Sequence, residues 1–429
     1  MIIRYWRSQR LAASLLLVTG FAISAIRAAE NISPLGERPD WATLEKYQET
    51  MTRDEFAEAL QKVYCTRGVS ADLIQVNEDA ARLLINKDLQ AWFTLRFAAD
   101  AASRKSVPSS WHPAKALPPT RRGRELAGLK IALDPGHIGG GWAQMEERWF
   151  QVSDSKPIQE GDMTLLVAKL LAPKLRKLGA TVSLVRENAE PVTPKRPADL
   201  KEVSRKILSR AGEATPRENF DGPADPEKEH TVRWQNERLF YRNSEIRARA
   251  KLVNSKIKPD VVLCLHFNAE AWDDPNKPTL IDRNHLHLLV NGSYLEPELE
   301  FDDVRFEMLR RLLSRTNEEE GPLAESSALA LARRTHLPPY EYTTENIAKV
   351  GGSGYVYARN LIATRLYQCP VVYFEPYVMN NDEIFWRVQE GDYEGIRNVN
   401  GTDRPAIFRE YADGVVEGLV DYYRAARER

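Results

Sequence analysis

The sequence predicts an α/β protein, in which a three-layer domain with a largely parallel twisted sheet between helices follows a small helical N-terminal domain. From residue 129 onward, short apolar runs alternate with stretches of helical periodicity, which is typical of a three-layer α/β domain. Most of the apolar runs are continuous rather than alternating, as expected for strands covered on both faces. Residues 40–100 show helical spacing instead.

Residues 1–29 have the layout of a secretory signal peptide. Arginines precede an apolar run at 11–26, and the small residues Ala28 and Ala29 follow it. The run is shorter than the roughly 20 residues that a membrane-spanning helix needs, which favours a cleaved signal over an uncleaved anchor. We therefore expect an exported protein, periplasmic or extracellular, without stable membrane insertion after cleavage.

A small helical domain is predicted for residues 30–103. Thr52 and Glu55 form a capping-box pattern ahead of helically spaced apolar residues, and the stretch 71–85 also has a helical pattern. Residues 104–128 are predicted to be a linker, because they combine several prolines with basic and small residues.

Five strands are predicted in the second domain, which spans residues 129–429. They lie at 129–137, 180–187, 259–269, 285–290 and 370–376. Helices are predicted at 162–178, 242–257, 302–315, 324–335 and 405–427. Pro173 predicts a kink or a split in the first of these, because proline inside a helix costs about 3 kcal/mol.

Two insertions interrupt this alternation. Residues 188–238 are rich in charge and proline and contain few apolar side chains, so they are predicted to form either a mobile loop or a lid over the site. Residues 270–323 add a polar stretch and an extra helix around the strand at 285–290.

The charge balance argues against nucleic-acid and polybasic membrane partners. The chain has 60 Lys and Arg against 61 Asp and Glu, well mixed along the sequence. Its three cysteines, Cys65, Cys264 and Cys369, are too few for a disulfide scaffold and too scattered for a thiolate metal site. We expect buried thiols at these positions, although one bridge stays open in an oxidising compartment.

Four ionisable residues stand at strand ends or directly before a helix. His137 ends the first predicted strand, His266 the third and Glu375 the last, while Glu160 precedes the first helix. In an open α/β sheet ligands bind outside the carboxyl ends of the strands, so these side chains are predicted to converge. Alone, each has an ordinary structural explanation, such as a glutamate favoured by a helix dipole. Their convergence predicts a functional site.

Two imidazoles and one carboxylate, from His137, Glu160 and His266, make a three-ligand Zn²⁺ site with an open fourth position. Zinc lowers the pKa of a bound water to about 7 and polarises a carbonyl. A further carboxylate must then take the proton of the water and pass it to the departing amine, and Glu375 is assigned this role. Asp134 is expected either to form the turn or to orient a ligand.

The same blocks of sequence resemble the zinc-dependent N-acetylmuramoyl-L-alanine amidases. They are DPGH at 134–137, Glu160, NSEIRARAKLVN at 243–254, LHFNA at 265–269 and VVYFEPYVMNN at 371–381. The resemblance covers roughly residues 129–426. It implies that His137, Glu160 and His266 bind zinc and that Glu375 is the general base and acid. It also implies hydrolysis of the amide between N-acetylmuramic acid and L-alanine in peptidoglycan, as in cell-wall remodelling or septum splitting.

The sequence departs from the family pattern at two points. Ile138 follows DPGH where the family usually has glycine, and Pro376 and Tyr377 follow Glu375 where a small or apolar residue and glycine are usual. In some relatives an inserted helix covers the zinc and is withdrawn by an activator. The resemblance thus implies a protein activator as a partner besides peptidoglycan.

Other residues carry weaker expectations. His285 and His287 lie two apart on one strand and offer a second metal pair, and Cys264 is expected in the core rather than at the metal. Gly139–Gly141 is interpreted as room for a substrate backbone near the metal. Arg359, before the last strand, is a candidate for holding a substrate carboxylate or carbonyl.

Two other functions stay open at this point. One is another zinc amide hydrolase of the same fold that acts as a peptidase within the stem peptide. The other is a catalytically gated wall-binding or regulatory protein. The presence of all four site residues argues against the second.

Overall fold

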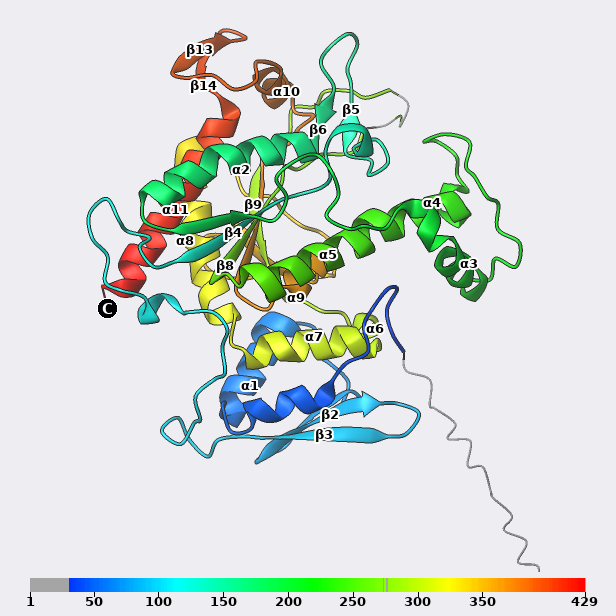
Figure 1. Ribbon diagram of the computed structural model, residues 1–429, viewed down its shortest axis with the longest axis vertical. Helices are drawn as coiled ribbons and strands as arrows, with labels where there is room; N and C mark the ends of the chain where they lie inside the picture. Colours follow the sequence, from blue (N-terminus) through cyan, green and yellow to red (C-terminus); the bar gives the residue numbers. More distant parts are fainter. Residues whose placement is uncertain (1–30, 273, 275–276, 429) are drawn as a thin grey trace, which may run out of the picture.

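Figure 1 shows the computed structural model, which describes residues 31–428 with the exception of 273, 275 and 276. A central sheet lies between two layers of helices, and a smaller N-terminal unit lies below it in this view. The three-layer α/β fold predicted from the sequence is therefore confirmed. The predicted signal peptide at 1–29 lies outside the described residues.

The central sheet has seven strands in the order β10-β11-β9-β12-β8-β4-β7. Their bounds are β4 Lys130–Pro135, β7 Thr181–Leu184, β8 Val261–Leu265, β9 Leu286–Val290, β10 Ile347–Lys349, β11 Val356–Arg359 and β12 Val371–Pro376. Strands β7, β4, β8 and β12 are parallel, whereas β9 is antiparallel to β12 and β10 to β11. The carboxyl ends of β4, β8 and β12 consequently meet at one edge.

All five predicted strands are present, as β4, β7, β8, β9 and β12. The sequence pattern missed β10 and β11 because they have only 3 and 4 residues and are separated by a glycine-rich turn. Two small hairpins complete the strands of this domain. They pair β5 (Trp149–Phe150) with β6 (Ile158–Gln159), and β13 (Ile396–Val399) with β14 (Thr402–Pro405).

Helices cover both faces of the sheet. On one face α2 (Glu160–Lys177), α8 (Asn317–Thr335) and α11 (Ile407–Arg427) pack on Leu133, Leu263 and Phe374. On the other, α5 (Glu245–Leu252) and α9 (Ile362–Leu366) pack on Ala132, Val262 and Cys264. Successive strand residues therefore enter opposite cores, which explains the continuous apolar runs. The short helix α10 (Asp382–Gln389) follows β12.

Helix α2 is continuous through Pro173, so the split predicted from this proline does not occur. Because proline has no N–H, the carbonyl of Lys169 lacks its partner in the helix. Both Lys169 and Pro173 lie on the exposed side of α2. Water can therefore satisfy that carbonyl.

The N-terminal unit is not purely helical. The predicted capping box is present, and helix α1 (Arg53–Ala59) begins after it. However, the stretch 71–85 forms strands, contrary to the prediction, in an antiparallel sheet of β1 (Ile74–Val76), β2 (Ala80–Asn86) and β3 (Ala91–Arg96). Within β2, Ala81 and Leu83 are buried on either side of the exposed Arg82, as expected where successive side chains of a strand point to opposite faces.

The extra helix predicted at 302–315 is α7 (Asp302–Leu313), which follows the short α6 (Glu296–Leu299). Phe306 and Leu309 of α7 share one buried core with Phe56 and Leu83 of the N-terminal unit. Figure 1 shows α7 lying between that unit and the sheet. The insertion at 270–323 thus joins the two parts of the molecule.

The insertion at 188–238 contains two helices, α3 (Lys201–Arg210) and α4 (Val232–Arg238). Leu200 of the insertion and Phe240, which follows the insertion, bury their side chains against Ile138, next to the candidate ligand His137. The segment was predicted to have little to bury and to be either a mobile loop or a lid, whereas α3 adds Val203 and Ile207 to this apolar cluster. Its few apolar residues are concentrated on one side, where Ile138 replaces the glycine usual in the resembled family.

The three cysteines are free and buried, as expected. Within residues 31–428, apart from the three left undescribed, no helix has the length and apolar character to cross a bilayer.

Candidate metal centre

The predicted ligands meet at the carboxyl edge of the sheet. His137 follows β4, His266 follows β8 and Glu160 is the first residue of α2. Each offers one ligand atom, and these atoms lie within 4.8 Å of one another. Oε2 of Glu160 is 3.2 Å from Nε2 of His137, and Oε1 is 3.2 Å from Nδ1 of His266. The convergence predicted from the sequence is therefore present.

Glu160 is almost completely buried, with 1% of its surface exposed. Its Oε1 accepts a hydrogen bond from the amide of Phe267 at 3.1 Å. Burial raises the pKa of Glu160, but the hydrogen bond with His266 and the charge of Arg148 oppose that effect and hold the pKa below its ordinary value. The carboxylate is consequently ionised and directed at both imidazoles.

His137 is held in a strained backbone conformation with φ of 58°. Arg249 of α5 donates hydrogen bonds at 2.7 Å to the carbonyls of His137 and Pro135. The guanidinium is itself bound by Asp134 at 2.9 Å and by Glu245 at 2.7 Å. Asp134 thus positions His137 through Arg249 and the backbone, rather than by contact with an imidazole.

Glu146 lies behind His137, at a position that the sequence did not single out. Its Oε2 is 3.6 Å from Nδ1 of His137, on the side of the ring away from Glu160, and accepts a hydrogen bond from the amide of Ile138 at 2.8 Å. Burial raises the pKa of Glu146 to about 7. A carboxylate in this place fixes the orientation of the ring and leaves Nε2 directed at the ligand cluster.

His266 is sandwiched between β12 and the DPGH turn. Its ring stacks on Tyr373 with a centroid distance of 4.0 Å and an angle of 15°. On the turn side, a Cβ atom placed on Gly136 would lie 2.1 to 2.4 Å from three atoms of the imidazole. Glycine at 136 is therefore required for the position of His266.

Replacing Gly136 with alanine is expected to displace His266, weaken zinc binding and lower the thermal stability. Overpacking of this kind costs about 1–3 kcal/mol. Gly141→Ala is the matched control, because a Cβ there would meet no atom within 4 Å. Zinc affinity by chelator competition and the melting temperature check this expectation. Equal zinc affinity in the two variants would contradict it.

Glu375 lies on β12, opposite His287 of β9. Burial and the nearby Glu160 raise the pKa of Glu375 well above its ordinary value, and Arg148 and Arg359 oppose this shift. Within the described part of the chain its carboxylate has no hydrogen-bond or ion-pair partner, and the side chain is mostly buried but keeps some exposure. Such a carboxylate is available to exchange a proton with a bound molecule.

Arg148 is a second residue that the sequence did not single out. Its Nε atom is 3.3 Å from Oε2 of Glu160 and 3.3 Å from Nε2 of His137. No periodic pattern marks Arg148 or Glu146, because both lie in the irregular segment between β4 and β5. Only the fold brings them to the ligands.

His285 and His287, the second pair of histidines, each use Nε2 for a contact with another side chain. Nε2 of His285 is 3.1 Å from Glu270, and Nε2 of His287 is 2.7 Å from the hydroxyl of Tyr342. Among the residues that the structure describes, His137, Glu160 and His266 form the one group of three or more His, Cys, Asp or Glu side chains placed to hold a metal ion. Cys264 lies in the core, as expected.

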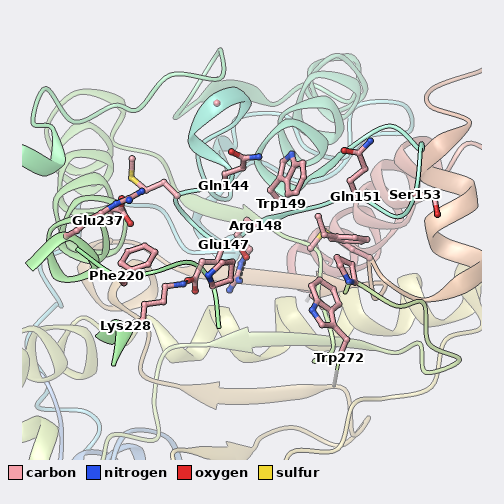
Figure 2. A pocket seen from close by; sticks show the side chains of 18 residues that line it. Gln144, Glu147, Arg148, Trp149, Gln151, Ser153, Phe220, Lys228, Glu237 and Trp272 are labelled. Atoms are coloured by element: carbon pink, nitrogen blue, oxygen red, sulfur yellow. Dashed lines mark hydrogen bonds and ion pairs between the residues drawn. The ribbon is translucent and has the colours of Figure 1, made fainter. Parts of the chain in front are cut away.

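A cavity of about 960 Å³ adjoins the centre through Arg148, which lines the cavity and contacts Glu160, whereas the three candidate ligands and Glu375 are not among its lining residues. Figure 2 shows Phe220 and Lys228 of the 188–238 insertion on one side, Trp149 and Trp272 on the other, and Arg148 between them. The insertion therefore forms one wall of the cavity.

The donor set fits Zn²⁺. Burial lowers the pKa of His137 well below its ordinary value, which keeps the imidazole neutral and able to donate a lone pair. Glu160 supplies the single negative charge. Two imidazole nitrogens and one carboxylate form the ligand set of many hydrolytic zinc enzymes.

No protein-family model matches this chain, and no curated protein matches it. The solved structures similar to it include the N-acetylmuramyl-L-alanine amidase Ami1 from Mycobacterium smegmatis, with 17% identity and a TM-score of 0.36 over 70% of this chain and 99% of that one. The CwlD amidase from Clostridioides difficile, in complex with the GerS lipoprotein, has 12% identity and a TM-score of 0.36 over 69% and 98%. The N-acetylmuramoyl-L-alanine amidase AmiC2 of Nostoc punctiforme has 13% identity and a TM-score of 0.35 over 69% and 98%. The motifs of the sequence resemble the same kind of amidase.

Proposed function

We propose that this protein is a zinc-dependent N-acetylmuramoyl-L-alanine amidase that hydrolyses the amide between N-acetylmuramic acid and L-alanine in peptidoglycan. The observation that carries the proposal is the cluster of His137, Glu160 and His266, whose ligand atoms lie within 4.8 Å of one another. The choice of this particular bond rests on the sequence motifs that contain these residues and Glu375, which resemble those of the amidases.

The residues divide the work as follows. His137, Glu160 and His266 hold the metal, which supplies Lewis acidity to water and to the scissile carbonyl when it is bound. Glu375 takes a proton from the attacking water and returns it to the departing amine of L-alanine. Its raised pKa suits the second step, because a carboxyl group with a raised pKa keeps a proton available for donation.

We propose that the protein acts on the cell wall outside the cytoplasmic membrane. The layout of residues 1–29 supports export. We also propose that the 188–238 insertion, which lines the cavity next to the metal centre, is the contact point for a protein activator.

Purified protein is expected to release intact stem peptides from peptidoglycan, and a chelator is expected to stop the release. Mass spectrometry of the products should show a free L-alanine amino terminus on each peptide. Restoration of activity by Zn²⁺ after chelation is the control for metal dependence. Products cut within the stem peptide would identify a peptidase instead, and wall binding without any product would identify a regulatory protein.

A further inference from the structure

Arg148 connects the metal centre with the cavity. Its Nε atom lies 3.3 Å from Oε2 of Glu160, while its side chain remains 37% exposed and lines the cavity. In Figure 2 it lies between the aromatic wall and the wall built by the 188–238 insertion. A molecule whose scissile bond reaches the ligand cluster from the cavity must therefore pass the guanidinium.

The position of Arg148 is fixed by its own backbone. Its carbonyl accepts a hydrogen bond from the amide of Glu160 at 3.2 Å, and its Nη1 donates to the carbonyl of Glu147 at 3.1 Å. Glu147 has a φ of 58°, and its carboxylate binds Lys228 of the insertion. The guanidinium is thus held in place before any ligand arrives, which lowers the entropic cost of binding.

Arg148 has carboxylates on its ligand-cluster side, where Nε lies 3.3 Å from Oε2 of Glu160 and where Glu375 is close enough to interact electrostatically, whereas the carboxylates on its cavity side are paired with other cations. Glu147 is paired with Lys228, and Glu237 is paired with Arg233 at 2.9 Å. Glu160 is shared with the imidazoles and is the single anionic member of the metal-binding set. Among the described residues, Nη2 of Arg148 has no hydrogen-bond acceptor. A guanidinium keeps its charge at every physiological pH, so the floor of the cavity offers a cation to an incoming anion.

We propose that Arg148 binds a carboxylate of an acidic peptide, and that the cavity receives the peptide side of the scissile amide. This inference rests on the proposed function and names the part of the substrate that the cavity selects. The planar fork of arginine suits a carboxylate, since charge-assisted bonds of this type are short and strong. The volume of about 960 Å³ is at the upper end of the range for small-molecule sites, which a muramyl peptide needs.

The test compares the binding of two soluble probes to zinc-loaded protein. The probes are N-acetylmuramoyl-L-alanyl-D-glutamate and its dicarboxamide, which differ only in the charge of the glutamate carboxyl groups. The full chain carries Glu375→Gln throughout, so that the probes are not consumed. Isothermal titration calorimetry gives the ratio of the two dissociation constants for each variant, and elemental analysis gives the zinc content.

The Glu375→Gln protein is expected to bind the acid about 10- to 100-fold more tightly than the amide. Adding Arg148→Gln should reduce this preference to less than about threefold, with zinc retained, because one charge-assisted contact is then missing. The matched control is Arg233→Gln, which removes a cavity arginine that has its own carboxylate partner and should leave the preference intact. Arg148→Lys keeps the positive charge beside Glu160 but loses the planar guanidinium, so an intermediate preference for the acid over the amide is expected. This variant provides the test if Arg148→Gln does not fold.

Three results would overturn the assignment of Arg148. They are equal binding of the two probes by the Glu375→Gln protein, an unchanged preference in the Arg148 variants, and an equal loss of preference in Arg233→Gln. The last result would assign selectivity to the overall charge of the cavity. Wild-type protein that releases stem peptides but shows no carboxylate preference refutes this inference alone. A preference that depends on Arg148, without hydrolysis of peptidoglycan, refutes the proposed function alone.

Discussion

Replacing Glu375 with glutamine is expected to abolish most turnover and leave the zinc in place. Glutamine has the same shape but cannot take a proton from water, and general acid–base catalysis contributes about 10²- to 10⁴-fold to the rate. Glu375 is not a member of the ligand cluster, so the metal content should stay near that of the wild type. The measurement is kcat on a soluble muropeptide together with zinc by elemental analysis.

Glu270→Gln is the matched control for this substitution. Glu270 lies in the segment that follows β8, and its carboxylate is bound by His285 at 3.1 Å and by Arg283 at 3.0 Å. It is therefore expected to affect stability more than turnover. Near-normal turnover in Glu375→Gln would remove the general-base assignment, whatever the control shows.

The environment of Glu375 explains why this effect should be large. A protein loses stability when a carboxylate that has structural partners is neutralised. Glu375 has no hydrogen-bond or ion-pair partner in the described chain. Burial and Glu160 disfavour its charge, and Arg148 and Arg359 favour it. Neutralisation should therefore cost the fold little, and the loss should fall on the chemical step.

The sheet and the ligand set could be predicted from the sequence because both depend on local patterns. A buried parallel strand is a continuous apolar run, and the residue that follows it is placed at the carboxyl edge by the topology. His137 and His266 follow from that rule. Glu160 follows as well, because α2 begins directly beside the same edge.

The N-terminal unit could not be predicted in the same way. Residues 71–85 contain apolar side chains at a helical spacing, although the turn at Asn77 lies within the stretch. What decides for strands is the pairing with β3 and the core shared with α7, which lies more than 200 residues further along the chain. Such long-range packing has no local signal.

Arg148 and Glu146 illustrate the same limit at the site. Both belong to an irregular charged segment, where a residue is ordinarily solvated. The backbone conformation at Glu147 and the pairing of β5 with β6 turn this segment back toward α2. The ligands were thus predictable from strand ends, while the residues that orient and surround them depend on the path of one loop.

Replacing Glu160 with glutamine is expected to remove zinc binding and, with it, activity. Glu160 is the single negative charge among the three ligands, and its oxygens lie 3.2 Å from a nitrogen of each histidine. A neutral amide is a poorer donor for Zn²⁺, which binds carboxylate and imidazole in sites of this kind. The loss of zinc affinity should exceed the roughly 10- to 100-fold that residues behind the ligands contribute.

Glu146→Gln provides the comparison, since Glu146 is also a buried carboxylate beside His137 but faces the opposite side of its ring. It should keep its zinc with an affinity lowered by about 10- to 100-fold. Glu160→Gln also leaves Arg148 beside a neutral group, which lowers stability without metal. The zinc-induced rise in melting temperature is therefore measured within each variant, because a ligand that binds only the folded state stabilises it by mass action. If zinc raised the melting temperature of Glu160→Gln as much as that of the wild type and did not raise that of Glu146→Gln, Glu146 would be the ligand and Glu160 the orienting residue.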